Sequence, residues 1–364
     1  MSAQRVSALR GVVQSLIEPH LGIDLGAAGA IDDVQVDGDR ARIAITLGFP
    51  AEEYKVELTR ILTERVRSLD WVREVDVHVG WRVAPHAVQR NLKPVQGVRN
   101  IVAVASGKGG VGKSTTAVNL ALGLAYDGAA VGLLDADIYG PSQPRMMGLS
   151  GQRPTSPDQK TLVAPVAYGV KVMSIGFLID EEQPMVWRGP MVTSALTQLL
   201  ETTRWGELDY LIVDMPPGTG DIQLTLSQRV PVSGAVIVTT PQDIALLDAR
   251  KGLRMFQKVE VPVLGVVENM STHVCSNCGH EEHVFGAGGG RRMAEQYDVE
   301  LLAELPLDIR IREQTDGGRP TVVAEPDSTL GRAYIELARR TAGRLARLAL
   351  QPTAPFPTIT VEDT

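Results

Sequence analysis

The chain has 364 residues, of which 44% are hydrophobic and 22% are charged, a composition typical of globular proteins. This length exceeds what one hydrophobic core usually holds, so we expect two domains. The formal net charge of −7 argues against binding of nucleic acid or anionic membranes through general electrostatic attraction. Two cysteines do not make a disulfide framework, and we find no membrane-spanning apolar run and no signal-peptide core, so we expect a cytoplasmic protein.

The first 82 residues predict a small α+β interaction domain. Apolar residues at helical spacing indicate helices over residues 3–17 and 52–68, and Pro19 ends the first of them. This unit has no cysteine and no cluster of catalytic residue types. Alternating apolar residues predict three strands: Ile31–Val36, Arg42–Leu47 and Val72–Val79.

Residues 83–99 lose this periodicity and contain Pro85 and Pro94, so we interpret them as a linker. We expect a nucleotide-binding domain over residues 100–350 and a flexible tail over residues 351–364. In the larger domain apolar segments alternate with helical stretches, which predicts an α/β fold, a doubly wound and mostly parallel sheet with helices on both faces. Its expected strands are Ile101–Ala105, Val131–Leu134, Val172–Ile175, Tyr210–Val213, Ala235–Thr239, Val263–Val267 and Leu302–Leu305.

A glycine-rich stretch, SGKGGVGKST at residues 106–115, lies between the first of these strands and a helical pattern. It contains the G-x-x-x-x-G-K-S motif of a P-loop, whose backbone N–H groups and following helix bind phosphates. Lys113 would reach the outer phosphates, and the Ser114 hydroxyl would hold Mg²⁺. A glycine turn without a ligand is the alternative, and the lysine, the hydroxyl and both flanking elements argue against it. The predicted nucleotide-binding residues are Gly107, Lys108, Gly109, Gly110, Val111, Gly112, Lys113, Ser114 and Thr115.

Lys108 is an additional lysine that a plain P-loop does not need. It could reach phosphates bound in a second subunit and act as an arginine finger does, an effect worth roughly 10³–10⁵ in rate. A solvated surface lysine is the alternative. The loop resembles the deviant Walker A motif of the MinD/ParA/nitrogenase-iron-protein class of ATPases. That resemblance implies a sandwich homodimer in which Lys108 crosses the interface as a catalytic group.

Three aspartates end apolar strands, at the edge of the sheet where ligands gather. Asp135 and Asp137 follow the second strand, and Asp214 ends the fourth. We assign Asp214 to the Walker B position, holding Mg²⁺ through water, and Asp135 to support of the metal shell. Resemblance to MinD-like ATPases implies that Asp137 orients the attacking water. Turn capping is the alternative for any single one of them.

The choice of base rests on resemblance. The Asn-Lys-x-Asp signature of guanine sites is missing from the sequence. In MinD-like ATPases, an asparagine after one strand and a Pro-x-Asp-type loop after another hold adenine, and Asn269, Pro306 and Asp308 stand in those places here. The resemblance therefore implies ATP.

Cys275 and Cys278 form a C-x-x-C pair on a loop after a strand. A redox dithiol lacks a thioredoxin-like setting here. Zinc could take both cysteines with His280 and His283, although this spacing would strain a tetrahedral site. A 4Fe–4S cluster usually takes four thiolates, which two chains related by a two-fold axis would supply. The spacing alone leaves zinc and the cluster equally supported.

From about residue 98 to residue 348 the chain resembles the Mrp/ApbC iron–sulfur cluster carrier ATPases. This resemblance implies an ATP-hydrolysing homodimer that binds a 4Fe–4S cluster through Cys275 and Cys278 and transfers it to apo iron–sulfur proteins, with cluster assembly proteins as further partners. The matching segments are VASGKGGVGKST (104–115), DADIYGPSQPRMMG (135–148), WRGPM (187–191), DYLIVDMPPGTGD (209–221), ENMSTHVCSNCG (268–279), FGAGGG (285–290) and LPLDIRIRE (305–313).

The N-terminal unit resembles the small domain, also found in separate iron–sulfur assembly proteins, that bacterial members carry. It departs from that pattern in two places. Residues 18–20 are Glu-Pro-His where Asp-Pro-Glu is usual, and residues 48–51 lack the cysteine of some relatives. A cluster-binding role for this domain is therefore not expected.

Two other functions fit parts of the pattern. A ParA/MinD-type positioning ATPase would need a basic surface or a membrane-tethering helix and has no use for the cysteines. A zinc-stabilised NTPase scaffold would use them structurally. Residues 329–349 form an amphipathic helix that we interpret as a cover for the sheet rather than a tether. We therefore expect no nucleic acid and no membrane among the partners, and we assign no role to Arg188 or to residues 286–290.

Overall fold

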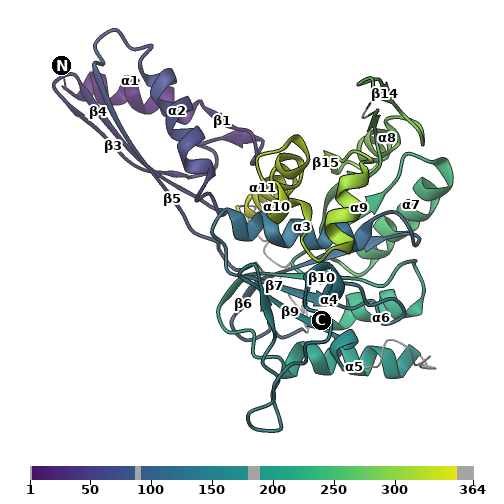
Figure 1. Cartoon of the computed structure of the whole chain (residues 1–364). Coiled ribbons are helices and arrows are strands. Elements are labelled where there is room, and N and C mark those ends of the chain that lie inside the picture. Colours follow the sequence, from purple (N-terminus) through teal and green to yellow (C-terminus); the bar gives the residue numbers. More distant parts are fainter. Residues whose placement is uncertain (1, 87–91, 179–188, 276, 351–364) are drawn as a thin grey trace, which may run out of the picture.

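The computed structural model describes residues 2–86, 92–178, 189–275 and 277–350, and Arg188 and the tail from residue 351 lie outside them. Figure 1 shows a small N-terminal domain that extends from one end of a larger domain built on a central sheet. The boundaries between domain, linker and tail stay predictions, although the first strand of the larger sheet begins at Val98, two residues inside the expected linker.

In the N-terminal domain two helices pack on one face of a three-stranded sheet. Strands β3 and β4 are antiparallel, and strands β4 and β5 are parallel because helix α2 forms the crossover between them. Val34, Ile43 and Ile45 point from the sheet into a core shared with the helices. The elements are α1 (Ser2–Gln14), β3 (Ile31–Asp37), β4 (Arg40–Leu47), α2 (Tyr54–Val66) and β5 (Glu74–Trp81).

The first helix is shorter than predicted, because it ends at Gln14 and not at residue 17. The carbonyl of Gln14 accepts the N–H of Gly26, and Leu16 accepts that of Leu25. The chain therefore turns into a short antiparallel ladder, β1 (Ile17–Glu18) with β2 (Ile23–Asp24), which the sequence pattern did not indicate.

The larger domain contains an eight-stranded sheet in the order β15-β12-β11-β6-β10-β7-β9-β8. All seven predicted strands are confirmed, and they are parallel to their neighbours. The eighth, β8 (Val166–Ala167), is antiparallel to β9 and too short to give a pattern. The others are β6 (Val98–Ser106), β7 (Val131–Asp135), β9 (Val170–Ser174), β10 (Leu208–Asp214), β11 (Gly234–Thr239), β12 (Val263–Glu268) and β15 (Glu300–Glu304).

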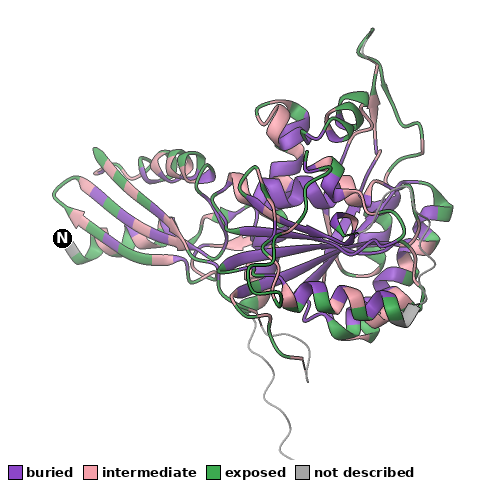
Figure 2. Cartoon of the chain, turned by 60° about the horizontal axis from the view of Figure 1, so that its bottom comes forward, coloured by how far each residue is buried: buried purple, intermediate pink, exposed green. Residues whose placement is uncertain are grey.

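Helices cover this sheet on both faces, so its strands are buried along most of their length (Figure 2). Helices α3, α10 and α11 pack together on one face, and α5 and α6 lie on the opposite side (Figure 1). The helices are α3 (Lys113–Tyr126), α4 (Gln143–Met146), α5 (Gly189–Thr202), α6 (Asp221–Arg229), α7 (Asp243–Lys258), α8 (Gly289–Gln296), α9 (Ile309–Asp316), α10 (Thr321–Ala324) and α11 (Thr329–Ala349).

Helix α11 covers the sheet as predicted. Its buried residues include Tyr334, Leu337 and Leu345, and it packs on α3 and β15. Within the described ranges, no helix has both the length and the apolar character that crossing a bilayer requires.

Candidate functional site

The phosphate loop runs from the end of β6 to the first residue of α3, as the sequence predicts. Gly110 and Gly112 have positive φ angles of 80° and 82°, which side chains rarely adopt. A Cβ on Gly112 would overlap the Asn269 side chain, and one on Gly107 would overlap the backbone at Asp248. The glycines therefore permit both the turn and its close packing against neighbouring loops.

Lys113 lies at the centre of the predicted carboxylates. Its side chain is 6% exposed, its ammonium donates to Asp214 Oδ1, and Asp137 Oδ2 lies 3.8 Å away. Asp135 and Asp214 are register partners at the carboxyl ends of β7 and β10. The parallel sheet thus brings together charged groups that are up to 101 residues apart in the chain.

Asp135 organises the loop that follows β7. Its carboxylate accepts four hydrogen bonds, from the backbone N–H groups of Asp137, Ser142 and Gln143 and from the Ser174 hydroxyl, at 3.0–3.1 Å. Burial and the neighbouring Asp214 raise the pKa of Asp135. Both of its oxygens are thus engaged by the protein, so its support of a metal site would be indirect.

Asp137 differs from Asp135 because one of its oxygens is free. Its Oδ1 is buried, with no hydrogen-bond partner within the described ranges. Burial raises the pKa of this carboxyl group, and the Lys113 ammonium opposes that shift. A buried carboxylate with one unpaired oxygen, next to the Lys113 ammonium, suits a group that binds water or substrate.

Gln143 belongs to the site but was missed by the sequence analysis. It is fully buried, and its side-chain nitrogen donates to the Ser114 carbonyl at 3.0 Å and to Asp214 Oδ2 at 2.9 Å. It therefore ties the helix after the P-loop to Asp214, the predicted Walker B residue. A neutral polar residue at the start of a four-residue helix carries no charge or spacing signal by which it could have been found.

Asn269 links the phosphate loop to the segment that carries the cysteines. It is buried, and its side-chain nitrogen donates to the Val111 carbonyl at 2.9 Å. Ser271 and Thr272 then pair through backbone hydrogen bonds with Leu305 and Leu307, which places the loop containing Pro306 alongside. Asp308 caps helix α9 and pairs with the Arg310 guanidinium, which lowers the pKa of that carboxyl group.

Lys108 is half-buried on the loop and makes no ion pair with any residue that the structure describes. Gly107, the residue before Lys108, packs against the backbone of helix α7. Ile244 and Leu247 on that helix are 71% and 54% exposed. The residue before Lys108 thus packs on a helix that also carries exposed apolar side chains.

The two cysteines lie at the tip of a short hairpin, β13 (His273–Val274) with β14 (Glu281–Glu282). Cys278 is exposed and Cys275 is partly exposed. Backbone N–H groups of Cys278 and Asn277 donate to the Cys275 sulfur and lower the pKa of its thiol. The loop is held by the Gly279 N–H on the Cys275 carbonyl at 2.8 Å.

The two histidines of the zinc alternative do not join the cysteines. His283 Nδ1 lies 2.8 Å from the Ser271 carbonyl, and His280 faces Glu282. In the parts of the chain that the structure describes, no three His, Cys, Asp or Glu side chains converge on one point. One chain therefore presents two thiols outward rather than a closed four-ligand site.

The glycines at 286–290 have a local structural role. Gly286 and Gly288 have positive φ angles, and helix α8 begins at Gly289. The Gly290 N–H donates to the buried Glu268 carboxylate, and a Cβ on Gly290 would lie 2.8 Å from Glu268 Cβ. These glycines therefore allow helix α8 to begin in close contact with strand β12.

Two family models match the chain. Residues 97–342 match the family described as NUBPL iron-transfer P-loop NTPase, and residues 7–79 match that described as iron-sulfur cluster assembly protein. The chain is 61% identical over 285 residues to an iron-sulfur cluster carrier protein of Pseudomonas fragi, covering 78% of this chain and 99% of the relative. It is 48% identical over 347 residues to that of Escherichia coli K12, covering 94% of each.

The similarity extends to an animal protein and to solved structures. Identity is 56% over 256 residues to mouse iron-sulfur cluster transfer protein NUBPL, covering 70% of this chain and 80% of that one. A nucleotide-binding protein of Archaeoglobus fulgidus in complex with ADP superposes with a TM-score of 0.56 at 39% identity, covering 64% of this chain and 90% of that chain. Pyrococcus furiosus MinD superposes at 0.50 with 22% identity, covering 66% and 97%, and shows the shared fold alone. The chain belongs to the NUBPL family of iron-transfer P-loop NTPases and carries an iron–sulfur assembly domain at its N-terminal end.

Proposed function

We propose that this protein is a cytoplasmic homodimer that carries a 4Fe–4S cluster between Cys275 and Cys278 of its two subunits and delivers it to apo iron–sulfur proteins. The observation that carries the proposal is the hairpin, which presents two thiols outward without a third ligand from the described residues. Four thiolates complete a cluster of this type, and a two-fold axis supplies the missing pair. The relatives named as cluster carriers support the same cargo.

The nucleotide site suits Mg²⁺ and ATP. Ser114 and Asp214 offer oxygen ligands only, the donor set that Mg²⁺ prefers, and Asp137 has an unpaired buried oxygen beside them. When bound, Mg²⁺ neutralises charge on the β- and γ-phosphates. Asn269, Pro306 and Asp308 would hold the adenine, and the Archaeoglobus relative binds ADP.

Each charged residue of the site has one task in this proposal. The Lys113 ammonium leaves Asp214 and binds the outer phosphates, which frees Asp214 Oδ1, and Ser114 and Asp214 would then hold the Mg²⁺ ion. Asp137 holds the attacking water in line with the γ-phosphorus, and Asp135 fixes the loop that carries Asp137. Lys108 of the second subunit would stabilise the negative charge of the transition state. The exposed apolar residues of α7 near the P-loop support an interface on this side.

Nucleotide and cluster would be coupled through the chain between them. Asn269 donates to the Val111 carbonyl of the P-loop, and Cys275 follows only six residues later. A change of loop conformation on hydrolysis therefore has a short path to the cysteine hairpin. We infer that hydrolysis switches the dimer between a form that holds the cluster and one that releases it.

Anaerobic reconstitution with iron and sulfide tests the cargo. About four irons per dimer are expected for the wild-type protein, and loss of iron and of the dimer-bridging cluster is expected for Cys275→Ser. Zinc at one per monomer without iron would overturn the proposal. Transfer to an apo acceptor should slow in Lys113→Ala and stay normal in the control Lys160→Ala, which changes an exposed turn. Equal transfer rates with ATP, with ADP and in Lys113→Ala would contradict the gating step.

A further inference from the structure

The N-terminal domain is seated closely on helix α11 of the ATPase domain. A Cβ on Gly343 would overlap the backbone of His20, and a Cβ on Gly48 would lie 3.0 Å from the Ala346 side chain. Directly after the neighbouring helix α3, the carbonyl of Asp127 accepts the N–H of Glu52 at 3.0 Å. These contacts join the turn after β1 and the start of α2 to the ends of α3 and α11.

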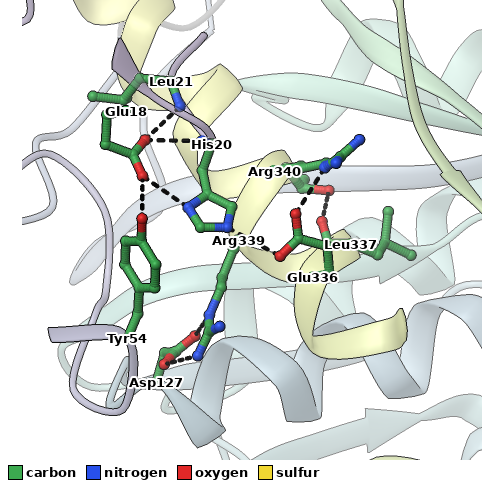
Figure 3. Close-up of polar contacts among 10 residues, drawn as sticks. Glu18, His20, Leu21, Tyr54, Asp127, Glu336, Leu337, Arg339 and Arg340 are labelled. Carbon is green, nitrogen blue, oxygen red and sulfur yellow. Dashed lines mark hydrogen bonds and ion pairs between the residues drawn. The ribbon is translucent and has the colours of Figure 1, made fainter. Parts of the chain in front are cut away.

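His20 lies in the middle of this contact, between carboxylates from both domains (Figure 3). Its side chain is 3% exposed. Nδ1 lies 2.8 Å from Glu18 Oε1, and Nε2 lies 3.0 Å from Glu336 Oε2. A neutral imidazole has one N–H group and one acceptor nitrogen, whereas an ionised carboxylate only accepts. Both contacts are therefore satisfied only when His20 carries a proton on each nitrogen.

The carboxylate of Glu18 is surrounded by hydrogen-bond donors. It is fully buried, and Oε1 also accepts the Tyr54 hydroxyl at 2.9 Å (Figure 3). Oε2 accepts the backbone N–H groups of His20 and Leu21 at 2.9 Å and 2.6 Å. Three donors besides the His20 ring converge on this carboxylate, so it is placed as the acceptor opposite His20 Nδ1.

Glu336 is ionised at neutral pH. Burial works against its charge, but hydrogen bonds from His20 and Arg340 lower its pKa to about 2. For His20, burial lowers the pKa, and the two carboxylates outweigh it and raise the pKa to about 9. Geometry and charge thus agree on a cationic His20 at neutral pH.

A second ion pair lies next to the bridge. Arg339 donates to Asp127 at 2.7 Å and 3.1 Å and stacks over the Tyr54 ring at 5.1 Å. The ionisable groups around His20 come from three elements and from the residue that follows α3: Glu18 of β1, Tyr54 and Glu57 of α2, Asp127 after α3, and Glu336, Arg339 and Arg340 of α11. With four carboxylates and two arginines there, a third cation at His20 reduces the excess negative charge.

We propose that protonated His20 is a latch that holds the N-terminal domain on helix α11, and that loss of its proton releases the domain. This inference goes beyond the proposed function, because it depends on neither the cluster nor the nucleotide. A histidine pKa near 9 in the docked form and about 6.5 when free means that docking is fully favoured below about pH 6.5 and is lost as the pH rises through 9. The same difference corresponds to about a 300-fold change in the docking equilibrium.

Small-angle X-ray scattering of the full chain between pH 6 and pH 10 tests the latch. The radius of gyration of the wild-type protein should rise near pH 9, while circular dichroism stays constant. The His20→Gln variant should have the larger radius of gyration of the undocked form already at pH 7. A glutamine amide can donate to one carboxylate, but it must face the other with its oxygen, and two acceptors cannot form a hydrogen bond. The matched control His78→Gln changes an exposed histidine of the same domain and should behave as the wild-type protein does.

Glu336→Gln separates a proton latch from a merely structural contact. A glutamine at position 336 can donate to Nε2 of a neutral His20, so this variant should stay docked above pH 9. Glu295→Gln, an exposed change on α8, is its control. Histidine-selective ¹⁵N NMR at pH 7.5 provides a readout independent of variant folding. A neutral His20 in that spectrum, a compact His20→Gln variant at pH 7, or a Glu336→Gln variant that opens at the wild-type pH would each overturn the proposal.

Discussion

Replacing Gln143 with methionine tests whether this side chain holds the P-loop and Asp214 together. Methionine has a similar length but no donor, so the Ser114 carbonyl and Asp214 Oδ2 each lose a hydrogen bond inside the protein. An unsatisfied buried acceptor costs about 1–3 kcal/mol, and a charged one costs more. The Ser114 carbonyl lies within α3, and methionine also removes Gln143 Oε1, which is buried without a partner among the described residues. The loss at Asp214 Oδ2 therefore dominates, and we expect Gln143→Met to lower the free energy of unfolding by about 1–3 kcal/mol.

Urea unfolding followed by tryptophan fluorescence measures this loss, since Trp205 is buried in the ATPase domain. The matched control is Gln198→Met on the exposed side of α5, which should stay within about 0.5 kcal/mol of the wild-type value. ADP binding measured by calorimetry should weaken more with Mg²⁺ than without it, because Asp214 loses its support. Wild-type stability together with wild-type ADP affinity would refute the positioning role of Gln143.

Two further predictions concern the domain contact and the cysteine hairpin. Gly343→Ala should lower the melting temperature, because the new methyl group meets the backbone of the N-terminal domain. Alanine in place of glycine normally stabilises a helix by up to about 1 kcal/mol. The control Gly11→Ala has open space on α1 and should therefore raise the melting temperature in the same thermal unfolding assay. In metal-free protein, alkylation of Cys275 should continue at pH values below the ordinary thiol pKa of about 8.5, because backbone N–H groups stabilise its thiolate. Mass spectrometry of the alkylated peptide measures the pH profile, and a midpoint at or above 8.5 would contradict that stabilisation.

Sequence reasoning located the groups of the site that lie at the ends of strands. Asp135, Asp137 and Asp214 follow apolar segments, and parallel strands necessarily bring their carboxyl ends to one edge. It did not locate Gln143, whose contacts depend on how the loop after β7 folds back. It also gave Asp135 a role in the metal shell without indicating its four protein donors, which come from three separate segments.

The domain contact shows a second limit. Residues 18–20 stood out only as a departure from a family pattern, because the partner of His20 is Glu336, 316 residues away. Helical periodicity extended the first helix to residue 17, whereas the backbone carbonyls of Gln14 and Leu16 bond to Gly26 and Leu25. The His20–Glu336 contact and the end of the first helix both depend on residues distant from the local pattern. A local sequence pattern carries no information about such pairing.

Helix α3 joins the P-loop to the domain contact. It begins at Lys113, ends at Tyr126 beside Asp127, and spans about 21 Å over its 14 residues. It packs against the sheet and α11, and release of the N-terminal domain removes the Glu52–Asp127 hydrogen bond just beyond one end of the helix, while nucleotide would bind at the other end. If α3 couples the two sites, the coupling is reciprocal. Opening of the latch then changes the affinity for ADP by a certain free energy, and bound ADP changes the opening equilibrium by the same free energy. We expect ADP affinity in His20→Gln to differ from that of the control His78→Gln at pH 7 and to match the wild-type affinity at pH 10. Identical affinity in all three cases would show that α3 does not couple the two sites.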